Sequence, residues 1–176
     1  MLIMKLLYFP NNALRIAAKS IKNINDDIKL LGINMLNTMY YYGGIGLAAT
    51  QVGINKRIIV IDISNKRNNP FIFVNPKIIK FSKSKIESKE GCLSIPEEQY
   101  YILRHQKIKI EAFNLLDQQN IELEANNLLS FCIQHEIDHL NGILFIDYLS
   151  NLKYQRILSK IKKFNKKLSH SKNKII

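Results

Sequence analysis

The spacing of apolar residues near the start of the chain follows the period of an α-helix. The apolar positions are Ile28, Leu31, Met35 and Met39. This spacing predicts a helix over residues 25–42. Asn25 offers an N-cap oxygen to that helix, two aspartates follow in its first turn, and Gly43 and Gly44 end it.

Short strand-like runs occupy the middle of the chain. Apolar or alternating segments between polar turns predict strands at residues 56–63, 71–74, 102–113 and 121–124. The Asn75-Pro76 pair is expected to end the second strand, and the apolar alternation restarts after it. Because the strands come first and an apolar helix follows, the order favours an α+β domain with antiparallel or mixed sheets.

Residues 126–142, NNLLSFCIQHEIDHLNG, are expected to form a helix at the centre of that domain. Its apolar side chains cover nearly the whole circumference, which is typical of a buried helix. Three of them fall within about 60° of His135 on the helical wheel, namely Leu128, Phe131 and Cys132. The opposite side carries Ile133, Ile137 and Leu140.

Within that helix, His135, Glu136 and His139 form the pattern His-Glu-x-x-His. At about 1.5 Å rise and 100° per residue, the two histidines stand roughly 6 Å apart and about 40° around the axis, so both can bind one metal ion. Glu136 is turned by about 100° from His135 and borders the cleft as a base for metal-bound water would. The alternative is a polar helix face with two unrelated histidines.

A candidate third ligand is Cys92, in the segment EGCLSIP between the predicted strands. Two imidazoles and one thiolate leave the fourth position of a tetrahedral ion open for water, as in catalytic zinc sites. Cys132 is interpreted instead as a soft apolar wall residue. On donor chemistry alone, Zn²⁺ is favoured among several divalent ions. The glycine-rich residues 43–54 lack the preceding strand and the lysine of a phosphate-binding loop.

Composition narrows the class of protein. The chain has 176 residues, of which 47% are hydrophobic and 23% charged, as expected for a globular domain. No apolar run reaches the roughly 18 residues of a membrane span, so we expect no membrane partner. Without a recognisable secretory signal, the two cysteines favour free thiols and a cytoplasmic location.

Positive charge is concentrated at the C-terminal end. The net charge is +12, and residues 151–176 contain nine Lys or Arg and no acid. We therefore divide the chain into a catalytic domain, residues 1–150, and a basic amphipathic helix and tail, residues 151–176. This end is either a solvated surface helix or a contact for a polyanion, with RNA as the favoured partner.

Three segments together resemble the signature motifs of the peptide deformylase family, in order and at similar separations. They are GIGLAATQ at residues 44–51, EGCLS at 90–94 and QHEIDHLNG at 134–142. The resemblance covers nearly the whole chain. It implies a hydrolase that removes the formyl group from the N-terminal formyl-methionine of nascent polypeptides and releases formate. It also implies one divalent metal ion per chain, Fe²⁺ physiologically, with Zn²⁺, Ni²⁺ or Co²⁺ as substitutes.

The resemblance also assigns roles to residues. It makes Cys92, His135 and His139 the metal ligands and Glu136 the general base and acid for attack by metal-bound hydroxide. It implies that the Gln51 amide and the Leu93 backbone N–H stabilise the oxyanion. Substrate contacts are implied at Ile45, Gly46, Gly91, Leu128 and Cys132. Glu90 and Asp138 are candidate partners of the ligand histidines or of Arg104.

The chain departs from the family pattern at the expected rim of the substrate cleft. The departures are Tyr42 and Gly43 in place of acidic residues, Gln99 in place of a basic residue and Ser88 in place of an apolar one. The implied partners are formyl-methionyl nascent peptides and, through a basic C-terminal helix, the ribosome or its rRNA. We expect a monomer.

Two other functions compete with this interpretation. One is a general HExxH metallopeptidase, in which the third ligand comes from downstream of the helix rather than from EGC. The other is a catalytically idle ribosome-binding protein whose core is held together by a metal ion. Release of formate from formyl-methionyl peptides distinguishes both from a deformylase.

Overall fold

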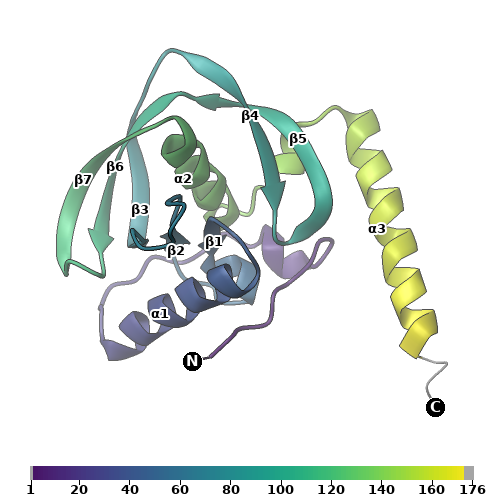
Figure 1. Cartoon of the computed structure of the whole chain (residues 1–176), viewed down its shortest axis with the longest axis horizontal. Coiled ribbons are helices and arrows are strands. Elements are labelled where there is room, and N and C mark those ends of the chain that lie inside the picture. Colours follow the sequence, from purple (N-terminus) through teal and green to yellow (C-terminus); the bar gives the residue numbers. More distant parts are fainter. Residues whose placement is uncertain (1, 173–176) are drawn as a thin grey trace.

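Helix α2 (Asn127–Leu140) lies at the centre of the molecule, enclosed by strands on several sides (Figure 1). The computed structural model describes residues 2–172, and the side-chain environments of residues 2–161. Every α2 residue from Ser130 to Ile137 is buried, and so are His139 and Leu140. The predicted central helix is therefore confirmed, and its ends lie within two residues of the prediction.

One face of α2 packs on a five-stranded antiparallel sheet. The strands, in spatial order, are β1 (Gly46–Ala48), β2 (Ile58–Ile61), β3 (Phe71–Phe81), β6 (Lys107–Asn114) and β7 (Gln119–Asn126). Helix α1 (Asp26–Tyr41) covers the other face. Strand β2 is buried on both faces because Ile58 and Val60 contact the α1 layer while Ile59 and Ile61 contact the α2 layer. The predicted N-cap is confirmed, since Asn25 accepts a hydrogen bond from the Ile28 N–H at 3.1 Å.

A separate antiparallel hairpin arches over α2 (Figure 1). It consists of β4 (Lys85–Cys92) and β5 (Ile95–His105). Its inner face joins a third apolar cluster, which includes Ile95, Ile102 and Phe145. Short 3₁₀ turns complete the body at η1 (Asn12–Arg15), η2 (Ala49–Val52) and η3 (Phe145–Tyr148). The α+β class is confirmed, and all pairs between the named strands are antiparallel.

Two strand predictions were wrong in detail. Strand β3 continues through Asn75-Pro76 with a register shift, because Asn75 adopts φ 51° and its side chain pairs with both the N–H and the C=O of Ile21, each at 2.8 Å. The predicted strand 102–113 is two strands, which separate at Gln106. The motif EGCLSIP is not a free loop, since Cys92 ends β4.

Helix α3 (Asn151–Lys172) leaves the body at η3 and extends along one side of it (Figure 1). Its first half is anchored, because Ile157 is fully buried among Phe9, Phe145 and Ile95, and Tyr154 packs partly against the same cluster. Leu152 on the same helix is 64% exposed. Among the described residues, no helix is long and apolar enough to cross a membrane.

The buried position of Ile157 predicts that the first half of α3 contributes to the stability of the body. We expect Ile157→Ala to lower the free energy of unfolding by about 2 to 5 kcal/mol, because it leaves a cavity in the third cluster. Urea denaturation measures the change. Leu152→Ala is the matched control and should change stability by less than about 0.5 kcal/mol. Equal, small effects of both substitutions would show that α3 is not anchored at Ile157.

Candidate metal centre and substrate cleft

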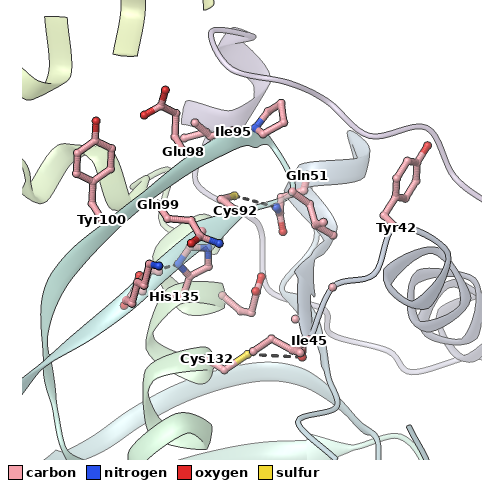
Figure 2. A pocket seen from close by; sticks show the side chains of 18 of the residues that line it. Tyr42, Ile45, Gln51, Cys92, Ile95, Glu98, Gln99, Tyr100, Cys132 and His135 are labelled. Atoms are coloured by element: carbon pink, nitrogen blue, oxygen red, sulfur yellow. Dashed lines mark hydrogen bonds and ion pairs between the residues drawn. The ribbon is translucent and has the colours of Figure 1, made fainter. Parts of the chain in front are cut away.

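A cleft of about 1070 Å³ opens between the β4–β5 hairpin, strand β1 and the first turns of α2. Figure 2 shows Gln51 facing Cys92 across the cleft, while Cys132 lies beside Ile45. Gln99 points to the His135 side of β5, whereas Glu98 and Tyr100 point away from it. The cleft therefore brings together residues from three separate parts of the sequence.

Cys92, His135 and His139 converge at the floor of this cleft. Their candidate ligand atoms all lie within 4.8 Å of one another, and Cys92 Sγ is 3.2 Å from His139 Nε2. The two imidazole rings are 4.9 Å apart and nearly perpendicular, so their nitrogens approach one point from different directions. Ligands of a tetrahedral ion are separated by roughly 3.5 Å, which this cluster approaches. The helical spacing of the histidines thus has the predicted geometric result.

The surroundings of these three side chains fit a divalent cation. Glu136 Oε2 and His139 Nδ1 are buried and have no hydrogen-bond partner in the part of the chain that the structure describes. Buried polar atoms of this kind are uncommon outside functional sites, because their desolvation is otherwise uncompensated. One thiolate and two imidazoles suit Fe²⁺, Zn²⁺, Ni²⁺ and Co²⁺ by their softness.

A chain of charged hydrogen bonds orients His135. Glu90 accepts from His135 Nδ1 at 2.9 Å, and Arg104 donates to the same carboxylate at 2.7 and 3.0 Å. Arg104 also donates to Asp138 at 2.6 Å, as does the Tyr148 hydroxyl at 2.9 Å. With Nδ1 engaged by Glu90, His135 presents Nε2 to the cleft. The expected hydrogen bonds are therefore present: Glu90 accepts from His135 and Arg104, and Asp138 accepts from Arg104.

Burial and neighbouring charge shift the pKa values of the site. Burial raises the pKa of Glu136 to about 7, so its carboxylate is a stronger proton acceptor than an exposed one. Burial opposes a charge on His135, but hydrogen bonds to Cys92 and Glu90 outweigh it and raise its pKa. Burial and the nearby His135 charge lower the pKa of His139.

Gln51 is held at the opposite wall by its own side chain. Its Oε1 accepts a hydrogen bond from the Ala48 N–H at 2.8 Å, which fixes the orientation of the amide. Its Nε2 then points at the centre, 3.4 Å from Cys92 Sγ and 3.2 Å from Ser94 Oγ. Leu93 lies between these two partners in the sequence and also lines the cleft. Ser94 was not assigned a role from the sequence, although it lies within the EGCLS motif.

Gly46 lets the β1 backbone approach the side chains of Glu136 and Cys132 closely. A Cβ at this position would lie 2.8 Å from Cys132 Sγ and 3.0 Å from the carboxyl carbon of Glu136. Ile45 is 46% exposed at the cleft, and its carbonyl accepts a long contact from Cys132 Sγ at 3.6 Å. Leu128 is 48% exposed and Cys132 7%, so the apolar wall predicted from the wheel is open at its outer end.

The rim residues noted in the sequence do line the cleft. They are Tyr42, Gly43, Ser88 and Gln99. Gly91 also lines it, opposite Gln99 in the β4–β5 register. Lys160 of α3 reaches the outer part of the cleft and donates to the buried Glu98 at 2.8 Å. Sequence reasoning missed this pair, because nothing local relates residues 62 positions apart.

The fold and the site together define an α+β hydrolase with a candidate open Cys-His-His metal centre. The family model described as polypeptide deformylase matches residues 3–155. The chain is 52% identical over 167 residues to the peptide deformylase of Buchnera aphidicola from Acyrthosiphon pisum, covering 95% of each chain. It is 46% identical to peptide deformylase 1 of Pseudomonas syringae, covering 94% of this chain and 98% of that one.

Solved structures agree with these sequence matches. The crystal structure of a peptide deformylase from Legionella pneumophila has a TM-score of 0.88 and 37% identity, covering 95% of this chain and 98% of that one. The Ehrlichia chaffeensis enzyme in complex with actinonin has a TM-score of 0.88 and 35% identity, covering 93% and 98%. The chain belongs to the peptide deformylase family, whose members are metal-dependent hydrolases.

The Glu90 hydrogen bonds predict that metal retention depends on this carboxylate. Glu90→Gln keeps the shape but weakens both the His135 and the Arg104 contacts. We expect the metal to dissociate about 10 to 100 times more readily, as is typical when a ligand histidine loses its partner. Competition with a chromophoric chelator measures this. Glu87→Gln, an exposed position on the same strand, is the control and should retain metal like the parent. If Glu90→Gln retained metal as well as the parent does, the Glu90 carboxylate would not be needed for metal retention.

Proposed function

We propose that this chain removes the formyl group from N-terminal formyl-methionine of nascent polypeptides and releases formate. The proposal is carried by one observation: Cys92, His135 and His139 converge beside the buried Glu136 in a member of the deformylase family. We assign these three residues as ligands of one divalent ion, with Fe²⁺ as the physiological metal. A bound ion would polarise the formyl carbonyl and lower the pKa of water.

Glu136 is proposed as the general base and acid. Its Oε2 is buried without a protein partner, so it is free to accept a proton from the attacking water. Its pKa of about 7 allows it to hold that proton and then deliver it to the leaving amine of methionine. Gly46 makes room for this carboxylate, and a larger residue there would displace it.

Gln51 and Leu93 are proposed to stabilise the oxyanion that forms at the formyl carbon. The Gln51 amide is fixed through its oxygen by Ala48, so its N–H groups are oriented before substrate arrives. Leu93 follows directly after Cys92 and lines the same cleft. Two donors from different elements then surround one oxygen, which supports hydrolysis rather than simple metal storage.

The substrate backbone is proposed to bind between two free strand edges. Strand β1 pairs only with β2, and β4 pairs only with β5, so each has an unpaired edge at the cleft. An extended peptide can add to such edges through main-chain hydrogen bonds. We assign Ile45, Gly46 and Gly91 to these contacts. The methionine side chain then packs against Leu128 and Cys132, which form the apolar wall on α2.

The alternatives are less well supported. A general HExxH metallopeptidase would recruit its third ligand downstream of the helix, whereas the nearest third donor here is Cys92 on β4. A catalytically idle ribosome-binding protein does not account for the open cleft, the oriented amide of Gln51 and the buried carboxylate of Glu136. The family relationship favours the deformylase over both.

We further propose that residues 1–150 form the catalytic domain and that residues 151–176 form a basic helix and tail that contact the ribosome. The buried Ile157 indicates that the helix is also anchored on the body. Beyond Ile161 the sequence contains six lysines and no acid, which suits non-specific contact with RNA phosphates. We propose a cytoplasmic location as well, because nascent chains are made there and its reducing conditions would keep Cys92 and Cys132 as free thiols.

The assignment of Glu136 predicts a selective loss of catalysis. We expect Glu136→Ala and Glu136→Gln to lower kcat for formyl-Met-Ala-Ser by about 10² to 10⁴. Formate release, coupled to a dehydrogenase and measured on oxygen-protected enzyme, reports the rate. Elemental analysis should show one metal ion per chain in both variants, because neither changes a ligand. Parent-like turnover in either variant would exclude Glu136 as the base.

The proposed tail contact predicts that catalysis and ribosome binding can be separated. Deleting residues 162–176 retains the anchor at Ile157 but removes six lysines. We expect weaker co-sedimentation with ribosomes, most clearly at moderate salt, and unchanged turnover of formyl-Met-Ala-Ser. Equal co-sedimentation of the deleted and full chains at low and moderate salt would contradict the proposed contact.

A further inference from the structure

A rigid corner forms where the β3–β4 turn meets the β5–β6 junction. We call residues 80–85 and 105–107 the lysine corner. Ser82 N–H donates to the Lys107 carbonyl at 2.9 Å, and Gln106 N–H donates to the Ser84 carbonyl at 3.0 Å. Side chains add to this, since His105 Nδ1 lies 2.6 Å from the Ser82 carbonyl and Ser84 Oγ lies 2.9 Å from Gln106 Oε1. The corner is therefore preorganised.

The lysine corner carries positive charge without a counter-charge. Its exposed lysines are Lys80, Lys83, Lys85 and Lys107. None of them has an acidic group within 4.0 Å in the described part of the chain, and no acid occurs in residues 79–86 or 105–110. On the adjoining sheet, Lys77 pairs with Glu111 and Lys109 with Glu122, at 3.4 and 2.6 Å. The corner therefore differs from these two neighbouring positions, where the lysines are paired with acids.

An exposed aromatic ring lies among these lysines. Phe81 is 51% exposed, and its ring centroid is 4.6 Å from that of His105. The His105 ring is in turn fixed by the Ser82 carbonyl. One face of Phe81 is therefore supported while much of the ring remains open to solvent.

We propose that the lysine corner binds single-stranded RNA. Four unpaired lysines attract phosphates without sequence preference, and Phe81 offers a base a surface for stacking. A membrane surface would instead need several apolar side chains that insert together. The corner lies on the far side of the body from α3 (Figure 1), so it is a contact distinct from the proposed tail contact. The proposal does not depend on the hydrolytic reaction.

The charge part is tested with the full-length protein and a fluorescein-labelled 16-nucleotide RNA of mixed sequence. The variant Lys83→Gln/Lys85→Gln/Lys107→Gln is compared with Lys22→Gln/Lys56→Gln/Lys66→Gln, which removes the same charge from exposed positions elsewhere. Fluorescence anisotropy at 50 to 200 mM salt gives Kd. We expect the corner variant to bind about tenfold more weakly or worse, with the slope of log Kobs against log salt reduced by about 2. The control should change far less.

The stacking part is tested with Phe81→Ala, for which Tyr101→Ala, 63% exposed and outside the corner, is the control. We expect Phe81→Ala to raise Kd by about 5-fold to 100-fold with an unchanged salt slope. Formate release should be the same in all variants, which verifies folding. Parent-like binding by the corner variant, or equal losses in both charge variants, would overturn the proposal. The proposal would also be overturned if the corner variant bound the RNA like the parent and lost binding only to phosphatidylglycerol vesicles.

Discussion

The packing of the β4–β5 hairpin on α2 depends on how the buried charge of Glu90 is balanced. A buried carboxylate is costly unless its charge is paired and its oxygens are hydrogen-bonded. Glu90 meets both conditions through Arg104 and His135, and Arg104 is itself shared with Asp138. These groups come from β4, β5 and α2. The packing of the hairpin on the helix and the orientation of the His135 ring, a proposed metal ligand, therefore depend on the same contacts.

This constraint explains the division of the molecule into two unlike layers. The layer between α1 and the sheet is apolar, with Met35, Met39 and Ile72 at its centre, and needs only close packing. The layer around α2 buries Gln134, His135, Glu136 and His139 beside its apolar residues. Gln134, for example, is held by the His105 carbonyl and by Ser130. The apolar layer supplies the rigidity that the polar layer needs for a defined geometry.

The sequence was informative where apolar periodicity was strong. Helices α1 and α2 were predicted almost to their ends. The spacing of His135 and His139 in the sequence also indicated that their rings converge. Strand β4 was less visible because its buried face carries Ser88 and Glu90 rather than apolar residues. The continuation of β3 past Asn75 depends on Ile21, 54 residues away, and no local pattern encodes that contact. Cys92 was a candidate ligand from its donor chemistry, whereas Gln51 gained a role only through the family motifs, since it comes from a separate element.

The distribution of charge separates the candidate metal centre from the surfaces that are proposed to bind RNA. Near the centre, two basic side chains are paired with acids: Arg104 with Glu90 and Asp138, and Lys160 with Glu98. Paired charges exert little net field, so the proposed recognition of a neutral formylated N-terminus can rest on shape and on strand edges. The excess positive charge instead lies outside, in the sequence of the tail and at the lysine corner. Salt screens the field of exposed charges beyond about 8 Å at physiological ionic strength. These charges can therefore attract phosphates without perturbing the pKa of Glu136.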